Sequence, residues 1–238
     1  MKGFNPKSNL IGGYSVNDGS IDFYSRIQCL IKNDSRVLDF GAGRGAWSDD
    51  ESYFRKETRT LKGKVEKLYA CDVDKAVSLN KNVDEILEIK DGKVDAPNEY
   101  FDIIIADYVL EHIKDPNLFR NEIDRLLKPG GWFCARTPHK YCLISIFASI
   151  IKNKFHKSIL KFVQPNRSEI DVFPTFYRLN TLYEVEKYFP SYIDKSFIFR
   201  NEPSYFFGNK FIYYFQKFIG NFLIDPLVGN LFIYKQKI

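Results

Sequence analysis

The chain contains 238 residues, of which 45% are hydrophobic and 27% are charged. This composition is typical of a globular protein and excludes disorder, collagen-like repeats and a coiled coil as the main architecture. The net charge of +5 is unevenly distributed, because residues 1–138 carry 21 basic and 23 acidic side chains whereas residues 139–238 carry 14 and 7. The longest apolar run, residues 142–151, is too short to span a bilayer, and no signal peptide is visible. We therefore expect a soluble, cytoplasmic protein.

Strands and helices alternate along the first 136 residues. Helices are expected over residues 21–32, from about 48 to 61, and over 117–127, where the preceding Asp115-Pro116 is a cap residue followed by a proline suited to a first turn. Strands are expected at residues 36–40, 65–71, 84–89, 101–106 and 132–136. This alternation predicts a Rossmann-like α/β fold with a mostly parallel sheet and helices on both faces.

The alternation breaks after residue 138. It resumes with a helix at 181–189 and strands at 192–200 and 230–236, which brings the expected sheet to seven strands, with the last one antiparallel. We expect a single domain in which residues 1–35 lead in, residues 36–138 form the core, and residues 139–180 and 201–229 are insertions that build a mainly helical cap.

A glycine-rich segment follows the first expected strand. Glycines at positions 41, 43 and 45 allow the backbone to turn tightly and to approach a ligand closely at the carboxyl end of the strand. Asp72 ends the second expected strand, where a carboxylate is able to accept hydrogen bonds from the hydroxyls of a ribose. Taken alone, the glycine pattern also admits a nicotinamide oxidoreductase.

Three segments in chain order resemble motifs of the class I S-adenosylmethionine-dependent methyltransferases. They are Val37–Gly45 (VLDFGAGRG), Asp107–Ile113 (DYVLEHI) and Leu126–Gly131 (LLKPGG). The resemblance covers residues 36–136 and implies the fold of that superfamily, methyl transfer as the activity and S-adenosylmethionine as the cofactor.

The resemblance also implies a set of cofactor-binding residues. They are Asp39, Gly41, Gly43, Gly45, Asp72, Val73, Asp91, Asp107, Tyr108 and His112. The first aspartate and the glycines would hold the methionine part, Asp72 the ribose, Val73 the adenine ring and Asp91 the adenine amine. Asp107 and Tyr108 would face the methyl-donor end, and His112 would pack in the pocket.

Candidate residues for the acceptor side follow the fifth expected strand. His139 is a candidate proton acceptor, although it is equally compatible with a loop residue that orders the cap. Tyr141, Tyr177 and Arg178 are candidate substrate-binding residues; Arg178 is suited to clamping a carboxylate or phosphate, or else to a salt bridge at the sheet rim. The four cysteines show no CxxC spacing and no metal-binding cluster is visible, so no metal site is expected.

The two insertions differ in character. The first is free of acidic residues from 139 to 168 and contains Lys152, Lys154, Lys157 and Lys161; the second has aromatic residues at nine of the 18 positions from 205 to 222. Phe207, Phe211, Phe215, Phe218 and Phe222 recur at helical spacing, which predicts core packing or, alternatively, an exposed lid or a peripheral membrane contact.

Positive charge beside an aromatic surface favours a small-molecule or glycan-type acceptor with an anionic or lipid-linked group, methylated on a hydroxyl. RNA ranks behind it, because nucleic acid calls for a long basic track. A nicotinamide oxidoreductase and a non-catalytic S-adenosylmethionine-binding protein also fit the sequence.

Overall fold

The structure is a computed structural model that describes residues 4–8, 10–142, 145, 173–203 and 206–238. Most of the first expected insertion, including the four lysines at positions 152, 154, 157 and 161, lies outside the described residues.

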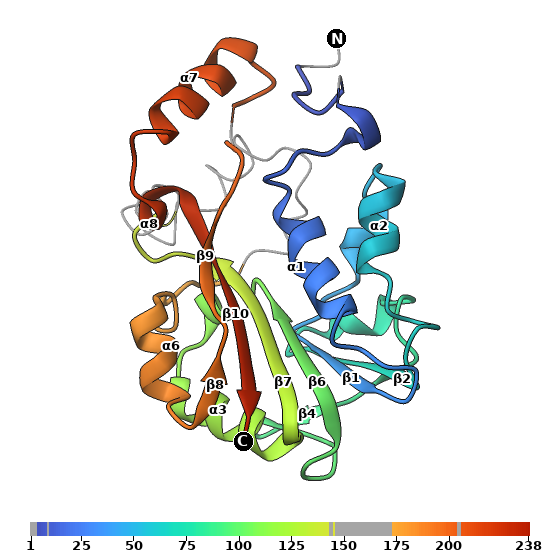
Figure 1. Ribbon diagram of the computed structural model, residues 1–238. Coiled ribbons are helices and arrows are strands. Elements are labelled where there is room, and N and C mark those ends of the chain that lie inside the picture. The colour runs from blue at the N-terminus through green and yellow to red at the C-terminus, as the bar shows by residue number, and fades with distance from the viewer. Residues whose placement is uncertain (1–3, 9, 143–144, 146–172, 204–205) are drawn as a thin grey trace.

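A mixed α/β architecture is built around one large sheet (Figure 1). Its strands are β1 (Arg36–Phe40), β2 (Lys67–Cys71), β3 (Glu85–Ile86), β6 (Phe101–Asp107), β7 (Leu127–Pro138), β8 (Tyr192–Asp194), β9 (Phe197–Arg200) and β10 (Gly229–Lys237). The order is β3-β2-β1-β6-β7-β10-β8, with β9 also paired to β10. The first five strands run parallel and β10 is antiparallel to β7, so the expected mostly parallel sheet with an antiparallel last strand is confirmed.

The remaining elements connect and cover these strands. The helices are α1 (Gly19–Gln28), α2 (Tyr53–Arg59), α3 (Pro116–Leu126), α6 (Leu182–Tyr188), α7 (Lys210–Gly220) and α8 (Asp225–Val228). Short 3₁₀ turns are η1 (Ile11–Gly13), η2 (Ala46–Asp49), η3 (Lys75–Leu79) and η4 (Leu110–His112), and a small hairpin is formed by β4 (Ile89–Lys90) and β5 (Lys93–Val94).

The sheet has eight strands where seven were expected, because the segment 192–200 forms two strands instead of one. The break lies at Ser196, whose backbone N–H donates to the side chain of Asp194 (2.9 Å) in a local turn. Both pieces pair with β10, so β8 and β9 together occupy one position in the sheet.

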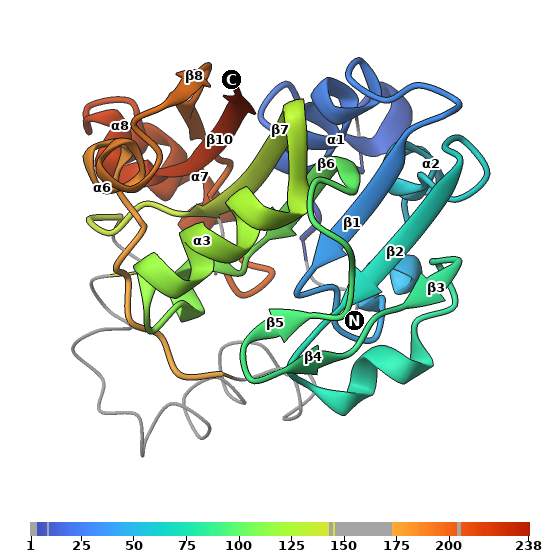
Figure 2. The same ribbon diagram turned by 90° about the horizontal axis from the view of Figure 1, so that it is seen from below.

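Two hydrophobic cores lie on the two faces of the sheet (Figure 2). Phe119, Ile123 and Leu126 of α3 and Val185 of α6 pack on one face. The other face is covered by α1, which buries Phe23, Tyr24 and Ile27. The central strand β6 is buried between these layers, as its nearly continuous apolar run predicts.

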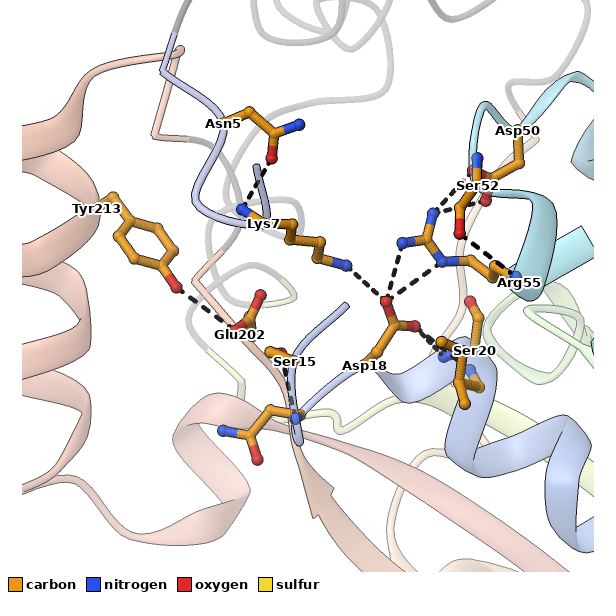
Figure 3. Close-up of polar contacts among 12 residues, drawn as sticks. Asn5, Lys7, Ser15, Asp18, Ser20, Asp50, Ser52, Arg55, Glu202 and Tyr213 are labelled. Atoms are coloured by element: carbon orange, nitrogen blue, oxygen red, sulfur yellow. Dashed lines mark hydrogen bonds and ion pairs between the residues drawn. The ribbon is translucent and has the colours of Figure 1, made fainter. Parts of the chain in front are cut away.

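Helix α1 begins earlier than its sequence suggests. The helix was expected to start at residue 21, but its first residue is Gly19 and its cap is Asp18, whose Oδ1 accepts hydrogen bonds from the backbone N–H groups of Ser20 and Ile21. The other oxygen of Asp18 is held by Lys7 (2.6 Å) and Arg55 (2.9 Å), as Figure 3 shows. The Asp18 carboxylate therefore joins the N-terminal segment, α1 and α2.

The segments outside the core gather at one end of the sheet. In Figure 1, α7 and the N-terminal segment lie beyond the ends at which β1, β6 and β7 finish, and the backbone N–H of Phe4 donates to the carbonyl of Gly208 (2.8 Å). No helix within the described part of the chain is long and apolar enough to cross a membrane. The end of the sheet where ligands bind in open α/β folds is thus bordered by α7, α8 and residues 4–8.

The buried lysine of β10 offers a test of how α6 and β8 are attached. The side chain of Lys235 is 0% exposed, and its ammonium group pairs with Glu186 of α6 and Asp194 of β8, both of which are partly solvated. We expect Lys235→Ala to lower the free energy of unfolding by about 2–4 kcal/mol, mainly through loss of the buried alkyl chain, and Lys235→Met to cost less than about 1.5 kcal/mol. Urea denaturation measures both, and equal losses would show that the ion pairs dominate.

Candidate functional site

The loop after β1 takes a backbone conformation that depends on its glycines. Gly41, Gly43 and Gly45 have φ values of 75°, 53° and 73°, in the left-handed region. A Cβ atom on Gly41 would lie 2.5 Å from the Val109 side chain, and one on Gly45 would lie 2.5 Å from Oδ1 of Asn80. A Cβ atom on Gly43 would meet nothing within 4 Å, so the loop backbone borders open space at this point.

Asp72 lies directly beside this loop at the end of β2. The backbone N–H groups of Gly43 and Asp74 each donate to one oxygen of its carboxylate, both at 2.8 Å. Each oxygen keeps a further lone pair for a ligand hydroxyl. The next residue, Val73, has an exposed side chain. The structure therefore brings together the glycines, Asp72 and Val73, as the sequence predicted.

Asp107 anchors a buried group of charges at the end of β6. Its carboxylate accepts two hydrogen bonds from Arg136 (both 2.8 Å), one from Arg59 (3.1 Å) and one from the Tyr24 hydroxyl (3.1 Å). Burial alone would raise the pKa of Asp107, but the two guanidinium groups outweigh it and hold the pKa below its usual value. Three of these four hydrogen bonds go to Oδ2, so most of the acceptor capacity of this carboxylate is taken up by the protein.

Asp39, near the end of β1, has the opposite behaviour. Burial raises its pKa to about 7, the negative charges of Asp107 and Asp72 add to the shift, and Arg59 opposes it. Within the described residues its carboxyl group has no hydrogen-bond partner. A partly buried acid that titrates near neutral pH therefore precedes the glycine loop.

Tyr108 and His112 follow Asp107 but face different neighbours. Tyr108 has a φ of 59°, an uncommon value for a non-glycine residue. The centre of its ring lies 4.8 Å from the guanidinium carbon of Arg136, and its hydroxyl accepts a hydrogen bond from the side chain of Asn230 (2.8 Å). His112 makes a 2.8 Å hydrogen bond from Nδ1 to the carbonyl of Pro174. Tyr108 is thus part of the charged cluster, whereas His112 ties η4 to the segment that begins at residue 173.

Asp91 lies apart from these residues. It occupies the turn between β4 and β5, where it is exposed and has a φ of 52°. No contact between Asp91 and the glycine loop or Asp72 is found among the described residues. Its contact with an adenine amine stays a prediction.

A cavity of about 720 Å³ lies beyond the end of β7. Among the residues that line it are all four candidates for catalysis and substrate binding, namely His139, Tyr141, Tyr177 and Arg178. The other lining residues are Lys140, Phe176, Thr181, Leu182, Tyr183, Glu184, Lys187, Tyr188, Ile198 and Pro226. Its walls therefore come from the chain after β7, from α6 and from the edges of β9 and α8.

His139 is buried beside this cavity. The backbone N–H of Tyr141 donates to its Nδ1 (3.1 Å), so in the neutral ring the hydrogen is carried by Nε2. Burial lowers the pKa of His139, against the opposing charge of Glu184, which favours the neutral ring. The imidazole thus offers Nε2–H as a hydrogen-bond donor.

A buried polar network fixes the wall next to His139. Thr137 donates from Oγ1 to Glu111 (2.7 Å) and accepts from Nδ2 of Asn180 (2.6 Å), which also donates to the carbonyl of Pro138 (2.9 Å). Nearby, Arg178 donates to the carbonyl of Lys114 (2.6 Å) rather than to an acidic side chain. The end of β7, η4 and the start of α6 are thereby joined around the cavity.

Sequence reasoning missed the basic members of the charged cluster. Arg59 and Arg136 belong to no short motif, and they lie 48 and 29 positions from Asp107 in the chain. The only local signal is that Arg136 stands at the end of a buried strand next to the one that ends at Asp107, where an unpaired charge would be costly.

Comparisons with known proteins show the family to which the chain belongs. Residues 18–182 match the model of a family described as a methyltransferase domain, and since this is more than half of the chain, the protein belongs to that family. No curated protein matches the chain at a significant level of sequence similarity.

Solved structures share its fold. A SAM-dependent methyltransferase from Aquifex aeolicus is 16% identical, with a TM-score of 0.52 over 94% of this chain and 95% of that one. One from Methanosarcina mazei is 15% identical, with a TM-score of 0.54 over 90% and 97%. The protein is thus an S-adenosylmethionine-dependent methyltransferase of the class I superfamily, and the oxidoreductase interpretation is set aside.

The pKa of Asp39 predicts a pH-dependent stability. The folded state binds a proton more tightly than the unfolded chain, so the stabilisation by the protonated group is lost as pH rises from about 4 through about 7. We compare the free energy of unfolding of Asp39→Asn with that of the unsubstituted protein. As pH rises from 5 to 8, the difference is expected to change by about 2 kcal/mol in favour of the variant. Urea titrations at several pH values measure this, with Asp34→Asn, at an exposed turn, as the control. A constant difference between the two proteins would contradict the prediction.

Proposed function

We propose that this enzyme methylates a hydroxyl of a small-molecule or glycan-type acceptor, with the cofactor at the glycine loop and the acceptor in the cavity beyond β7. The observation that carries the proposal is that His139, Tyr141, Tyr177 and Arg178 line one cavity. This cavity adjoins the carboxyl end of β7, the neighbour of β6 in the sheet. Ligands of open α/β sheets bind at these strand ends.

The glycine loop and its neighbours fit S-adenosylmethionine. The open space at Gly43 leaves room for a ligand against the backbone, and Asp72 keeps lone pairs for two ribose hydroxyls. Val73 offers an exposed apolar side chain to an adenine ring, and ionised Asp39 would complement the positive charge of the cofactor. When bound, S-adenosylmethionine supplies a methyl group on a sulfonium, which needs orientation rather than further activation.

Asp107 and Tyr108 are proposed to act mainly by positioning. Asp107 holds Arg59 and Arg136 beside the crevice, and the Tyr108 ring packs on Arg136. The roles of Asp91 and His112 toward the cofactor stay predictions.

The cavity favours an acceptor with an anionic group and a ring-shaped or apolar part. It presents Lys140, Arg178 and Lys187 against a single acid, Glu184, together with the aromatic rings of its wall. Its volume of about 720 Å³ suits a small ligand, whereas RNA would need an extended basic track. RNA as the acceptor is therefore the second candidate.

His139 is proposed to contact the acceptor through Nε2. Removing a proton from the acceptor hydroxyl at this atom would require the ring hydrogen to move to Nδ1, which faces the N–H of Tyr141. The tautomer set by this hydrogen bond therefore favours orientation of the acceptor oxygen by Nε2–H over proton removal by the ring, and the hydroxyl proton of the acceptor would pass to solvent as the methyl group is transferred.

Asp72 provides the test of the cofactor site. We expect Asp72→Ala to weaken S-adenosylhomocysteine binding by about 1–3 kcal/mol in titration calorimetry, because two charge-assisted hydrogen bonds are lost. The neighbouring Asp74→Asn serves as the control and leaves affinity unchanged. Unaltered affinity in the Asp72 variant would contradict the proposed site.

The acceptor class is tested by incubating the protein with methyl-labelled cofactor and a panel of hydroxylated, anionic small molecules and sugars, alongside RNA. Labelled product is expected from the small acceptors. Methylated RNA with no labelled small molecule would overturn the proposal.

His139 is then tested with that acceptor. His139→Ala is expected to lower kcat by about 10- to 100-fold with cofactor affinity unchanged, whereas His139→Gln, which places an amide donor near the position of Nε2, retains more activity. Unchanged turnover in His139→Ala would leave the residue with a purely structural role. If kcat of the unsubstituted enzyme decreases toward low pH, and both substitutions abolish this decrease, His139 is instead identified as a general base.

A further inference from the structure

Among the described residues, helix α7 packs against the rest of the protein through the side that carries Tyr213. Its buried residue is Tyr213, whose ring packs against Phe4 and Phe206. The hydroxyl of Tyr213 donates to Glu202 (3.4 Å), as Figure 3 shows. Asn209 caps the helix through its side-chain oxygen. The position of the helix is therefore fixed without the aromatic residues on its other side.

Those residues form an exposed aromatic face, which consists of Phe211, Phe215, Phe218 and Phe222. Their side chains are 85%, 65%, 60% and 73% exposed, and spacings of four and three residues place Phe211, Phe215 and Phe218 in one row on α7. The ring of Phe222, two residues after the end of the helix, packs against that of Phe218, with 5.1 Å between the ring centroids. Of the two alternatives expected for this stripe, core packing does not hold for these four rings, and what packs inward on α7 is Tyr213. Four neighbouring exposed rings make an apolar patch that a soluble monomer seldom leaves uncovered.

The charge around this face has one sign. Lys210 and Lys217 are exposed on α7, and neither forms an ion pair within the described residues. The sequence has no acidic residue between Glu202 and Asp225. A second copy of the chain docked here would bring these lysines together, whereas an anionic surface would attract them.

We infer that the aromatic face of α7 docks onto the surface of a lipid bilayer that contains anionic lipids. Helices that lie in a membrane interface combine bulky apolar side chains with flanking lysines, and α7 has both. Its aromatic rings would enter the boundary between head groups and acyl chains, and Lys210 and Lys217 would contact lipid phosphates.

This docking would also bring the cavity close to the membrane. Helix α8 follows α7 after four residues, and its Pro226 lines the cavity. A lipid-linked acceptor would then reach the cavity from the bilayer surface; this extension rests on the proposed function, whereas docking itself does not.

Vesicle sedimentation tests the inference with the full chain. Vesicles of phosphatidylcholine with about 30% phosphatidylglycerol are expected to bind the protein, and phosphatidylcholine alone to bind it more weakly. The triple variant Phe211→Ser/Phe215→Ser/Phe218→Ser is expected to lower the partition coefficient at least about tenfold. Lys210→Gln/Lys217→Gln is expected to weaken binding to the anionic vesicles only, and added salt to do the same.

The control is Leu118→Ser/Tyr53→Ser, which removes two exposed apolar side chains from α3 and α2 and is expected to leave binding unchanged. Because the substituted rings are exposed, each variant is expected to fold, and thermal melting verifies this.

Failure of the natural protein to bind either vesicle, or equal binding by the triple variant, would overturn the inference. A dimer in sedimentation velocity that the triple variant dissociates, without vesicle binding, would show that a second copy covers this face instead. If the triple variant no longer binds vesicles but still methylates a free acceptor, the membrane docking and the proposed function are shown to be independent of each other.

Discussion

The ion pair between Asp107 and Arg136 is the contact on which the ligand-binding end of the sheet depends. The two residues stand opposite each other at the ends of β6 and β7, and both side chains are almost completely buried. Leaving either charge alone in this position would cost several kcal/mol, so the cluster needs its additional donors from Tyr24 of α1 and Arg59 of α2. Through these contacts the sheet, α1 and α2 are held in one arrangement, and the charge of Asp107 contributes to the raised pKa of Asp39.

Two spaces with different linings lie on either side of the end of β7. On the side of β1 and β2 the lining is a glycine-rich loop and a few carboxylates, where we propose that the cofactor binds. On the other side, basic and aromatic side chains line the cavity of about 720 Å³. Tyr108 bonds to Asn230 of β10, and the backbone N–H of His139 bonds to the carbonyl of Gly229, so β10 supports both sides. Methyl transfer between ligands bound in these two spaces would require their reacting atoms to meet in a fixed orientation, and a common support favours this.

Much of this arrangement is predictable where one short segment determines the structure. The strand before the glycine loop and the cap at Asp115 both carry local signals, and each forms close to its expected position. The strand expected at residues 132–136 instead begins at Leu127, because Leu127 already pairs with Phe101 of β6. The expected helix from 48 to 61 fails for a local reason as well: it becomes η2 and a shorter α2, because Ser52 caps a new start.

Sequence patterns did not predict the contacts between residues that lie far apart in the chain. The cap of α1 is Asp18, whose carboxylate is held in place by Lys7 and Arg55, and Arg55 lies 37 positions away in the chain. Likewise, the tautomer of His139 depends on a backbone group two residues on, and no side-chain pattern records it. The aromatic spacing of α7 predicted a helix correctly, but only the structure shows which side is covered.

The most direct test of this account is a crystal structure of the protein grown with S-adenosylhomocysteine. The account predicts that the ligand lies against the loop Gly41–Gly45, with its ribose hydroxyls within hydrogen-bonding distance of Asp72, and that the cavity beside His139 stays free for the acceptor. A ligand bound in that cavity, or away from the glycine loop, would contradict it.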